Sequence, residues 1–151
     1  MLKGSYILIL EVPGQREMMV GKLGHICFAP GFYAYVGSAL NGLEARLYRH
    51  LRKEKKLHWH IDYLLHDSAS IAAIIVSPGL VKKECLLAQA LGRRLLSIRG
   101  FGCSDCRCSS HLYFSGEKSS LIAHAAGAFR QAGISFQFWS EPDSGRAGRH
   151  L

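Results

Sequence analysis

An uninterrupted apolar run near the start of the chain constrains the fold more than any other feature of the sequence. Residues 5–12 read SYILILEV, and most of them are β-branched, aromatic or aliphatic residues that favour strands. A continuous apolar run of this length is typical of a strand that is buried within a sheet. The chain is therefore expected to fold around a buried strand at residues 5–12.

Strand-like and helix-like segments interleave along the rest of the chain. Residues 32–38 (FYAYVGS) form the clearest further strand, in which Tyr33, Tyr35 and Gly37 share one face. The opening strands resemble an antiparallel meander, which predicts an α/β fold of the α+β kind: a small mixed, mainly antiparallel central sheet flanked by helices. Further strands are expected at 24–29, 70–77, 111–114 and 134–139, helices at 43–53, 80–91 and 117–132, turns or loops at 15–22 and 100–110, and either a strand or a helix at 58–65.

The length and composition of the chain predict one cytoplasmic domain. Its 151 residues fit a single core, expected over residues 1–140, with a flexible polar tail at 141–151. No apolar run reaches the roughly 18 residues of a membrane span, so no membrane partner is expected. The first residues run directly into the first strand without a signal peptide. Five cysteines, an odd number, argue against a secreted disulfide framework.

Positive charge is concentrated in one short segment. The chain has 19 Lys and Arg against 11 Asp and Glu, a formal net charge of +8, which favours polyanionic partners. Six of these cations lie within residues 46–56, where only Glu54 opposes them. No glycine-rich signature of a phosphate loop or a dinucleotide site is present, so no nucleotide cofactor is expected. The residues predicted to contact nucleic acid are Arg49, Lys53, Lys55, Lys56, His58 and His60.

The helix expected at 43–53 carries an apolar stripe beside a basic one. Leu43, Leu47 and Leu51 recur once per turn and are predicted to pack on the core. The neighbouring face is formed by residues spaced three, four and seven positions apart, namely Arg46, Arg49, His50 and Lys53. This basic edge is expected to lie beside the core.

Three residue types in this region suit the cleavage of a phosphodiester. Such a reaction needs a base for water, cations for the phosphoryl oxygens and a group that assists the leaving oxygen. Tyr35 can act as the base only if positive charge lowers its pKa from the usual value of about 10. Arg46 offers a planar donor fork for phosphate, and His50, one turn further on, can relay a proton.

These residues resemble the motifs of the GIY-YIG nuclease superfamily. Gly4-Ser5-Tyr6 stands for the first motif, with Ser5 where isoleucine is usual, and Tyr35-Val36-Gly37 stands for the second. The segment LEARLYRH at 43–50 resembles the family's following helix. The resemblance implies that Tyr35 is the general base, Tyr6 its supporting partner, Arg46 the phosphate ligand and His50 an auxiliary acid or relay.

The resemblance also implies a divalent metal. The superfamily has a metal-binding glutamate on a later helix, and Glu84 lies on such a helix, with Asp62 as the second candidate. A hard oxygen ligand suits Mg²⁺ or Mn²⁺. The alternative for Glu84 is a solvated carboxylate that the dipole at a helix start stabilises.

Several segments resemble one uncharacterised branch of the superfamily, the domain of unknown function number 123. They are YVGSA, RHL, HWHIDYLL and the stretch SDCxCxSHL. If residues 58–62 form a strand, His58, His60 and Asp62 share one face, where they contact phosphate, bind a metal or transfer protons. The alternative is a hydrogen-bonded structural cluster above a core that contains Trp59 and Ile61.

Cysteines crowd into the loop expected at 100–110. Cys103, Cys106, Cys108 and His111 offer three sulfurs and one nitrogen, the number that a structural Zn²⁺ needs. A loop of reduced thiols that Asp105 stabilises by hydrogen bonds is the alternative. In a third interpretation, Asp105 and His111 line the active site.

The features together predict a metal-dependent endonuclease that acts on DNA, rather than on RNA, in the repair or processing of unusual DNA structures. The alternative is a nucleic-acid-binding module that keeps the fold without cleavage and acts beside a repair enzyme. A zinc-stabilised protein-interaction domain is a third class, for which the basic patch would be incidental.

Overall fold

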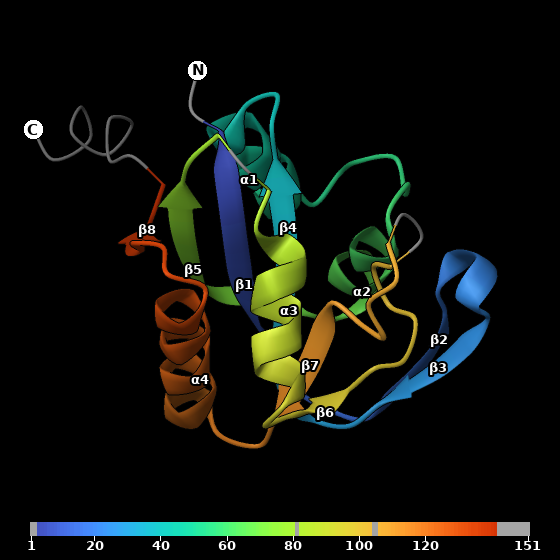
Figure 1. The fold of residues 1–151 in the computed structure, drawn as a ribbon. Coiled ribbons are helices and arrows are strands. Elements are labelled where there is room, and N and C mark those ends of the chain that lie inside the picture. Colours follow the sequence, from blue (N-terminus) through green and yellow to red (C-terminus); the bar gives the residue numbers. More distant parts are fainter. Residues whose placement is uncertain (1–2, 81, 104–105, 142–151) are drawn as a thin grey trace, which may run out of the picture.

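The computed structural model describes residues 3–80, 82–103 and 106–141 (Figure 1). Six strands form the main sheet: β1 (Gly4–Val12), β4 (Gly31–Ala39), β5 (Ser70–Pro78), β6 (Leu96–Ser97), β7 (Leu112–Ser115) and β8 (Gln137–Trp139). Four α-helices are present within these ranges: α1 (Leu43–Leu51), α2 (His60–Asp67), α3 (Glu84–Gly92) and α4 (Lys118–Gln131). A small second sheet contains β2 (Arg16–Met19) and β3 (His25–Phe28), with the 3₁₀ helix η1 (Gly21–Leu23) between them.

The main sheet has the strand order β6-β7-β4-β1-β5-β8, and every neighbouring pair is antiparallel. The mixed α+β class predicted from the sequence is therefore confirmed. β1 lies inside the sheet and pairs with β4 on one side and β5 on the other. This position explains its composition, because a strand with neighbours on both edges and helices on both faces has almost no exposed surface.

The sheet separates two apolar cores. Ile7 and Ile9 of β1 face the core beneath α3 and α4, whereas Tyr6, Leu8 and Leu10 face the core beneath α1 and α2. The same alternation places Tyr33 and Tyr35 of β4 on the α1 and α2 side, as predicted. Figure 1 shows α3 and α4 in front of the sheet, α1 and α2 behind it, and the β2–β3 hairpin projecting from one end.

Several predicted boundaries were wrong. Within residues 58–65, for which strand and helix were both open, residues 60–65 form the start of α2 and no strand is present. α1 ends at Leu51, so Lys53 lies beyond the helix, and α3 begins only at Glu84. β2 was predicted as a turn. Met18 is its only buried residue, so its sequence shows no alternation of apolar and polar residues that would indicate a strand.

The predicted tail falls mainly on residues 142–151, which lie outside the described residues. Among the helices that the structure describes, none has the length and apolarity needed to span a bilayer.

Gly37 and Tyr6 are directly paired across β4 and β1 and pack closely against each other. A Cβ at Gly37 would lie 2.5 Å from Cζ and the hydroxyl oxygen of Tyr6, a distance that forces one of them to move. Glycine at position 37 is thus what allows the Tyr6 ring to cross over β4 toward α1.

Gly37→Ala should destabilise the fold by about 1–3 kcal/mol, the usual cost of overpacking a rigid core. Gly127→Ala in α4 is the matched control, because a Cβ there meets nothing within 4 Å. The control should gain about 0.5–1 kcal/mol from the higher helix propensity of alanine. Urea unfolding of both variants measures the difference, and equal stabilities would contradict the close packing on Tyr6.

Candidate active site and metal-ligand cluster

Three predicted catalytic residues meet on the α1 side of the sheet. The Tyr6 hydroxyl of β1 and Nε2 of His50 in α1 are 2.7 Å apart, in a hydrogen bond between residues that are 44 positions apart in sequence. The ring centroids of Tyr35 and His50 are 6.2 Å apart. All three side chains are buried, with Tyr35 exposed to 8 % and His50 to 2 %. β1, β4 and α1 therefore assemble one polar centre inside the core.

His50 is a neutral imidazole in this centre. Burial, together with the charge of Lys55, lowers its pKa to about 3. Burial also raises the pKa of Tyr6 to about 12, although the charge of Arg46 opposes this shift. The Tyr6–His50 contact therefore joins two uncharged groups at neutral pH. His50 takes part in a hydrogen bond with the Tyr6 hydroxyl, but its low pKa leaves it without a proton that it could supply as an acid.

Tyr35 is a protonated phenol in the described structure. Burial raises its pKa well above 10, and the charges of Tyr6 and Glu84 raise it further. Arg46 acts in the opposite direction, but its charge does not compensate for the burial. The positive charge that a tyrosine base requires must therefore come from an additional cation at the site.

Arg46 is held in place by two contacts. Its Nη1 donates a hydrogen bond to the carbonyl oxygen of Ser38, 3.0 Å away. Its guanidinium carbon lies 4.4 Å from the centroid of the Trp59 ring, and that of Arg49 lies 4.2 Å from the same ring. The Trp59 side chain packs against the core, as the alternative interpretation of residues 58–62 expected, and is also a cation–π platform for two arginines. The signal in the sequence was an aromatic residue close to a basic helix.

Arg49 and Asp62 form an ion pair that joins α1 to α2, in which Asp62 is fully buried and the Arg49 side chain is 21 % exposed. Nη1 and Nη2 of Arg49 donate to the two carboxylate oxygens of Asp62, each over 2.9 Å. Asp62 Oδ2 also accepts the backbone N–H groups of His58 and Trp59, at 2.9 and 2.8 Å, and thereby caps the first turn of α2. Burial alone would raise the pKa of Asp62, but these donors hold it below its usual value. The predicted face of His58, His60 and Asp62 does not form, and Asp62 is a structural residue.

Part of the predicted nucleic-acid patch has a structural role. Arg49 is bound by Asp62, and Nζ of Lys55 donates to the carbonyl oxygens of Arg49 and His50, at 2.9 and 2.8 Å, where α1 ends. These contacts satisfy carbonyls that the end of a helix leaves without partners. The exposed members of the patch are Arg52, Lys53, Lys56 and His58.

His60 and Gly102 connect α2 to the loop between β6 and β7. The backbone N–H of Gly102 donates to Nδ1 of His60 over 2.8 Å. Gly102 has φ +75°, and a Cβ there would lie 3.2 Å from Cε1 of Tyr35 and 3.1 Å from Cβ of His111. Only a residue without a side chain fits between Tyr35 and His111 in this conformation. The sequence offered no reason to single out Gly102 among the other glycines of the loop.

Glu84 lies at the mouth of a pocket of about 320 Å³. It is the first residue of α3, and its side chain is exposed to 19 %. Its Oε1 lies 3.2 Å from Nζ of Lys82, and its Oε2 lies 3.9 Å from Nδ1 of His111. The pocket is lined by Lys82, Glu84, Cys85, Leu86, Gly102, Cys106 and His111.

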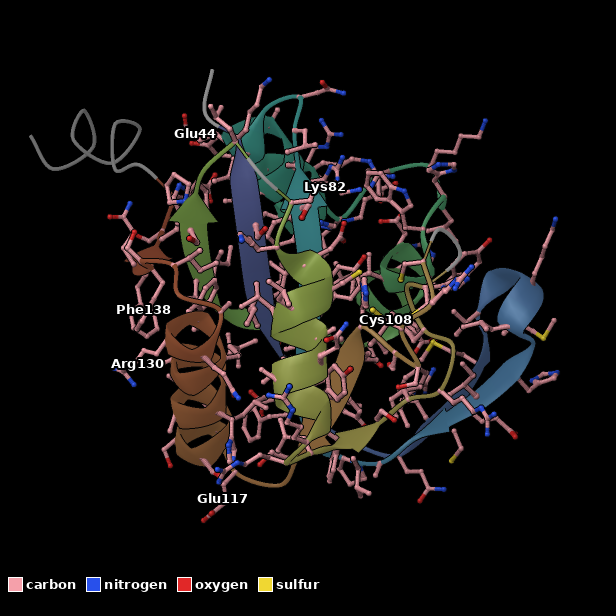
Figure 2. The ribbon with its side chains drawn as sticks, in the orientation of Figure 1. Glu44, Lys82, Cys108, Glu117, Arg130 and Phe138 are labelled. Carbon is pink, nitrogen blue, oxygen red and sulfur yellow. The ribbon has the colours of Figure 1, made fainter. Side chains whose placement is uncertain are left out.

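A metal-ligand cluster forms the inner wall of this pocket. The side-chain donor atoms of Cys85, Cys106, Cys108 and His111 all lie within 4.8 Å of one another, and the group can hold a metal ion. Figure 2 shows Cys108, on the loop that joins β6 to β7, close beside α3.

The predicted ligand set for this cluster was wrong in one member. Cys85 of α3 takes the place assigned to Cys103, whose thiol instead points to the carbonyl oxygen of Phe101, 3.3 Å away. All five cysteines are free thiols, and burial raises the pKa of Cys103 to about 12. Asp105, predicted to stabilise this loop or line the active site, lies outside the described residues.

The family of the chain is shown by its sequence as a whole. Residues 5–134 match the profile described as "Domain of unknown function DUF123". The chain belongs to this family. The matched range extends from β1 to beyond α4 and contains every residue of the polar centre and of the metal-ligand cluster. No curated protein and no solved structure matches the chain.

Asp62→Asn in this DUF123 domain should lower the free energy of unfolding by roughly 1.5–3 kcal/mol, because it replaces the charged acceptor of Arg49 and of two backbone N–H groups by a neutral amide. Asp67→Asn is the matched control, since Asp67 pairs with Arg16 over 2.9 Å at the exposed surface. The control should lose about 1 kcal/mol or less. Chemical denaturation of both variants tests the contrast, and a similar loss in the two would contradict a structural role for Asp62.

The pH dependence of stability should report the buried imidazole. The pKa of His50 is about 3 in the folded state, below its ordinary value of 6.5, so the unfolded chain takes up this proton first. Stability conferred by neutral His50 is complete above pH 6.5 and is lost as the pH falls toward 3. His50→Gln removes this titration and should flatten the decline in the free energy of unfolding over that range.

His66→Gln, at an exposed position of α2, is the control for replacing an imidazole by an amide. It should retain the wild-type pH dependence. An unchanged slope in His50→Gln would show that His50 does not titrate as a buried neutral group.

Proposed function

We propose that this DUF123 domain is a divalent-metal-dependent endonuclease of GIY-YIG type that hydrolyses phosphodiester bonds in DNA, in repair or in the processing of unusual DNA structures. One observation carries the proposal: Tyr6, Tyr35, Arg46 and His50, which come from three separate elements, share one centre on the same side of the sheet. A chain that needed only a stable core would place apolar side chains there, because buried polar groups cost free energy.

Arg46 is the proposed phosphate ligand. The Trp59 ring and the Ser38 carbonyl fix its position, while only one of its N–H donors is used in the bond to Ser38. A guanidinium whose orientation is fixed before substrate binds loses little entropy when it contacts a phosphate. The exposed Arg52, Lys53 and Lys56 lie beyond the end of α1 and suit the backbone of a nucleic acid.

Tyr35 is the proposed general base, and Tyr6 and His50 are its supporting pair. The hydrogen bond between Tyr6 and neutral His50 holds both rings beside Tyr35. A bound Mg²⁺ or Mn²⁺ would supply the positive charge that lowers the pKa of Tyr35 and stabilises the phosphoryl oxygens.

Glu84 is the proposed ligand of this hard cation. It is the only carboxylate that lines the pocket within the described residues, and its charge is felt by both Tyr6 and Tyr35. The residues present fit such an ion, because Mg²⁺ commonly keeps several waters and uses one or two carboxylates together with substrate phosphates.

Zn²⁺ is the second proposed metal, at the cluster of Cys85, Cys106, Cys108 and His111. Three thiolates and one imidazole form a usual structural zinc set. A cytoplasmic location, expected from the sequence composition, and a repair-protein partner complete the proposal.

The alternative function is a nucleic-acid-binding module that does not cleave. The pKa of Tyr35 favours this alternative, because burial holds it far above neutral pH and no described residue compensates. In that case the exposed cations would bind the DNA backbone, and catalysis would belong to a partner enzyme.

Arg46→Ala should lower the rate of DNA cleavage by about 10²–10³-fold, the usual effect of removing one donor to developing charge. Tyr35→Phe should lower it by about 10²–10⁴-fold through loss of the base. The measurement uses labelled single-stranded, duplex and branched DNA, with Mg²⁺ or Mn²⁺ and with a chelator. Arg130→Ala, an exposed arginine of α4, is the matched control and should cleave at the wild-type rate.

Salt-sensitive DNA binding without cleavage in any of these conditions would replace the endonuclease by the binding module. If the chain neither binds nor cleaves DNA, both functions are contradicted and the zinc-stabilised protein-interaction domain is favoured.

A further inference from the structure

One carboxylate lies between the two metal sites of the domain. Oε2 of Glu84 is 3.9 Å from Nδ1 of His111, and the other ring nitrogen of His111, Nε2, is 3.5 Å from the Cys106 thiol. The imidazole thus presents one nitrogen to the cysteine cluster and the other to Glu84. Zinc-bound histidines usually donate their second N–H to a carboxylate, which fixes the ring and strengthens the bond to the metal.

We propose that Glu84 is the outer-shell carboxylate of a zinc site formed by Cys85, Cys106, Cys108 and His111, and that zinc at this site holds the wall of the active-site pocket in place. The second half of this proposal rests on the proposed nuclease function, whereas the first half concerns the zinc site alone. Glu84 then has two roles: one oxygen orients His111, and the other remains available to the pocket.

The cluster has the dimensions of a four-coordinate site. Zinc–sulfur bonds of about 2.3 Å place the sulfurs of a tetrahedral site about 3.8 Å apart. The four donor atoms already lie within 4.8 Å of one another, so small side-chain movements are enough to enclose an ion. His111 is 3 % exposed, and the loop that carries it is joined to the sheet by a bond from Val36 N–H to the His111 carbonyl, 2.9 Å long.

Ligation would join α3 to a loop that follows it in the sequence. Cys85 is on α3, whereas Cys106, Cys108 and His111 are on the loop between β6 and β7. The same loop carries Gly102, which lies against Tyr35 and donates to His60. Glu84 precedes Cys85 by one residue, so drawing Cys85 onto the ion also fixes the position of Glu84. The zinc site and the proposed catalytic residues therefore share both the loop and the start of α3.

The first test compares cysteine variants by metal analysis of the purified chain. Wild type and Cys103→Ser should hold about one zinc ion per chain, whereas Cys85→Ser should hold none. Cys103 is the matched control because it lies on the same loop but outside the cluster. Two results would overturn the proposal. In the first, Cys103→Ser loses zinc while Cys85→Ser retains it. In the second, the wild type holds no zinc after purification and zinc addition.

The second test measures the affinity for Zn²⁺ by competition with a chelating dye, without DNA. Glu84→Gln should weaken zinc binding by about 10–100-fold, the usual effect of losing an outer-shell partner. Glu117→Gln, a carboxylate at the start of α4 (Figure 2), is the control and should not change the affinity. Co²⁺ spectra of both variants show whether the thiolate set remains intact, so a folding defect is distinguished from a weakened site.

An unchanged zinc affinity in Glu84→Gln would contradict the outer-shell role. The coupling to the pocket is read from the affinity for Mn²⁺, measured by electron paramagnetic resonance, which should fall in Cys108→Ser relative to Cys103→Ser. Equal Mn²⁺ affinities would refute the coupling. These measurements require no DNA cleavage. If zinc binding is weaker in Glu84→Gln and the wild type does not cleave DNA, the nuclease proposal is contradicted and the zinc-site proposal is supported.

Discussion

The hydrogen bond between Tyr6 and His50 is the contact on which the rest of the polar centre depends. It crosses from the central strand to α1 inside the apolar core, and it exists because Gly37 leaves room for the Tyr6 ring. Both partners are uncharged, so the pair avoids the large cost of a buried ion. This contact fixes α1 against the sheet. In this position of α1, Arg46 and Arg49 lie over the Trp59 ring, and Tyr35 lies beside His50.

The polar residues of this DUF123 domain therefore form two groups: one group makes structural contacts, and the other remains partly accessible. Arg49 with Asp62, and Lys55 with the end of α1, hold the framework together and leave little of their charge for a ligand. Arg46 and Glu84 remain partly accessible and face the region of Tyr6 and Tyr35. Some basic residues of segment 46–56 thus make structural contacts and others are exposed. The composition of the segment does not show which residues belong to which group.

The sequence predicted the strands and the helix whose positions depend on a local pattern of apolar side chains. The apolar run of β1, the alternation in β4 and the leucine stripe of α1 follow from side-chain periodicity, and the structure confirms them. Tertiary contacts decide the rest. Residues 60–67 form α2, whose first turn Asp62 caps by accepting the backbone N–H of Trp59, and β2 pairs with β3. Cys85 joins the cluster through the packing of α3 against a distant loop, which spacing within the loop does not reveal.

The central claim is that Arg46, Tyr35 and Glu84 surround a scissile phosphate, and a crystal structure of Tyr35→Phe with DNA and Mn²⁺ tests it most directly. The account predicts a phosphate about 3 Å from the Arg46 guanidinium, within hydrogen-bond distance, and an anomalous manganese peak beside Glu84. DNA bound away from Arg46, with no manganese at Glu84, would contradict it.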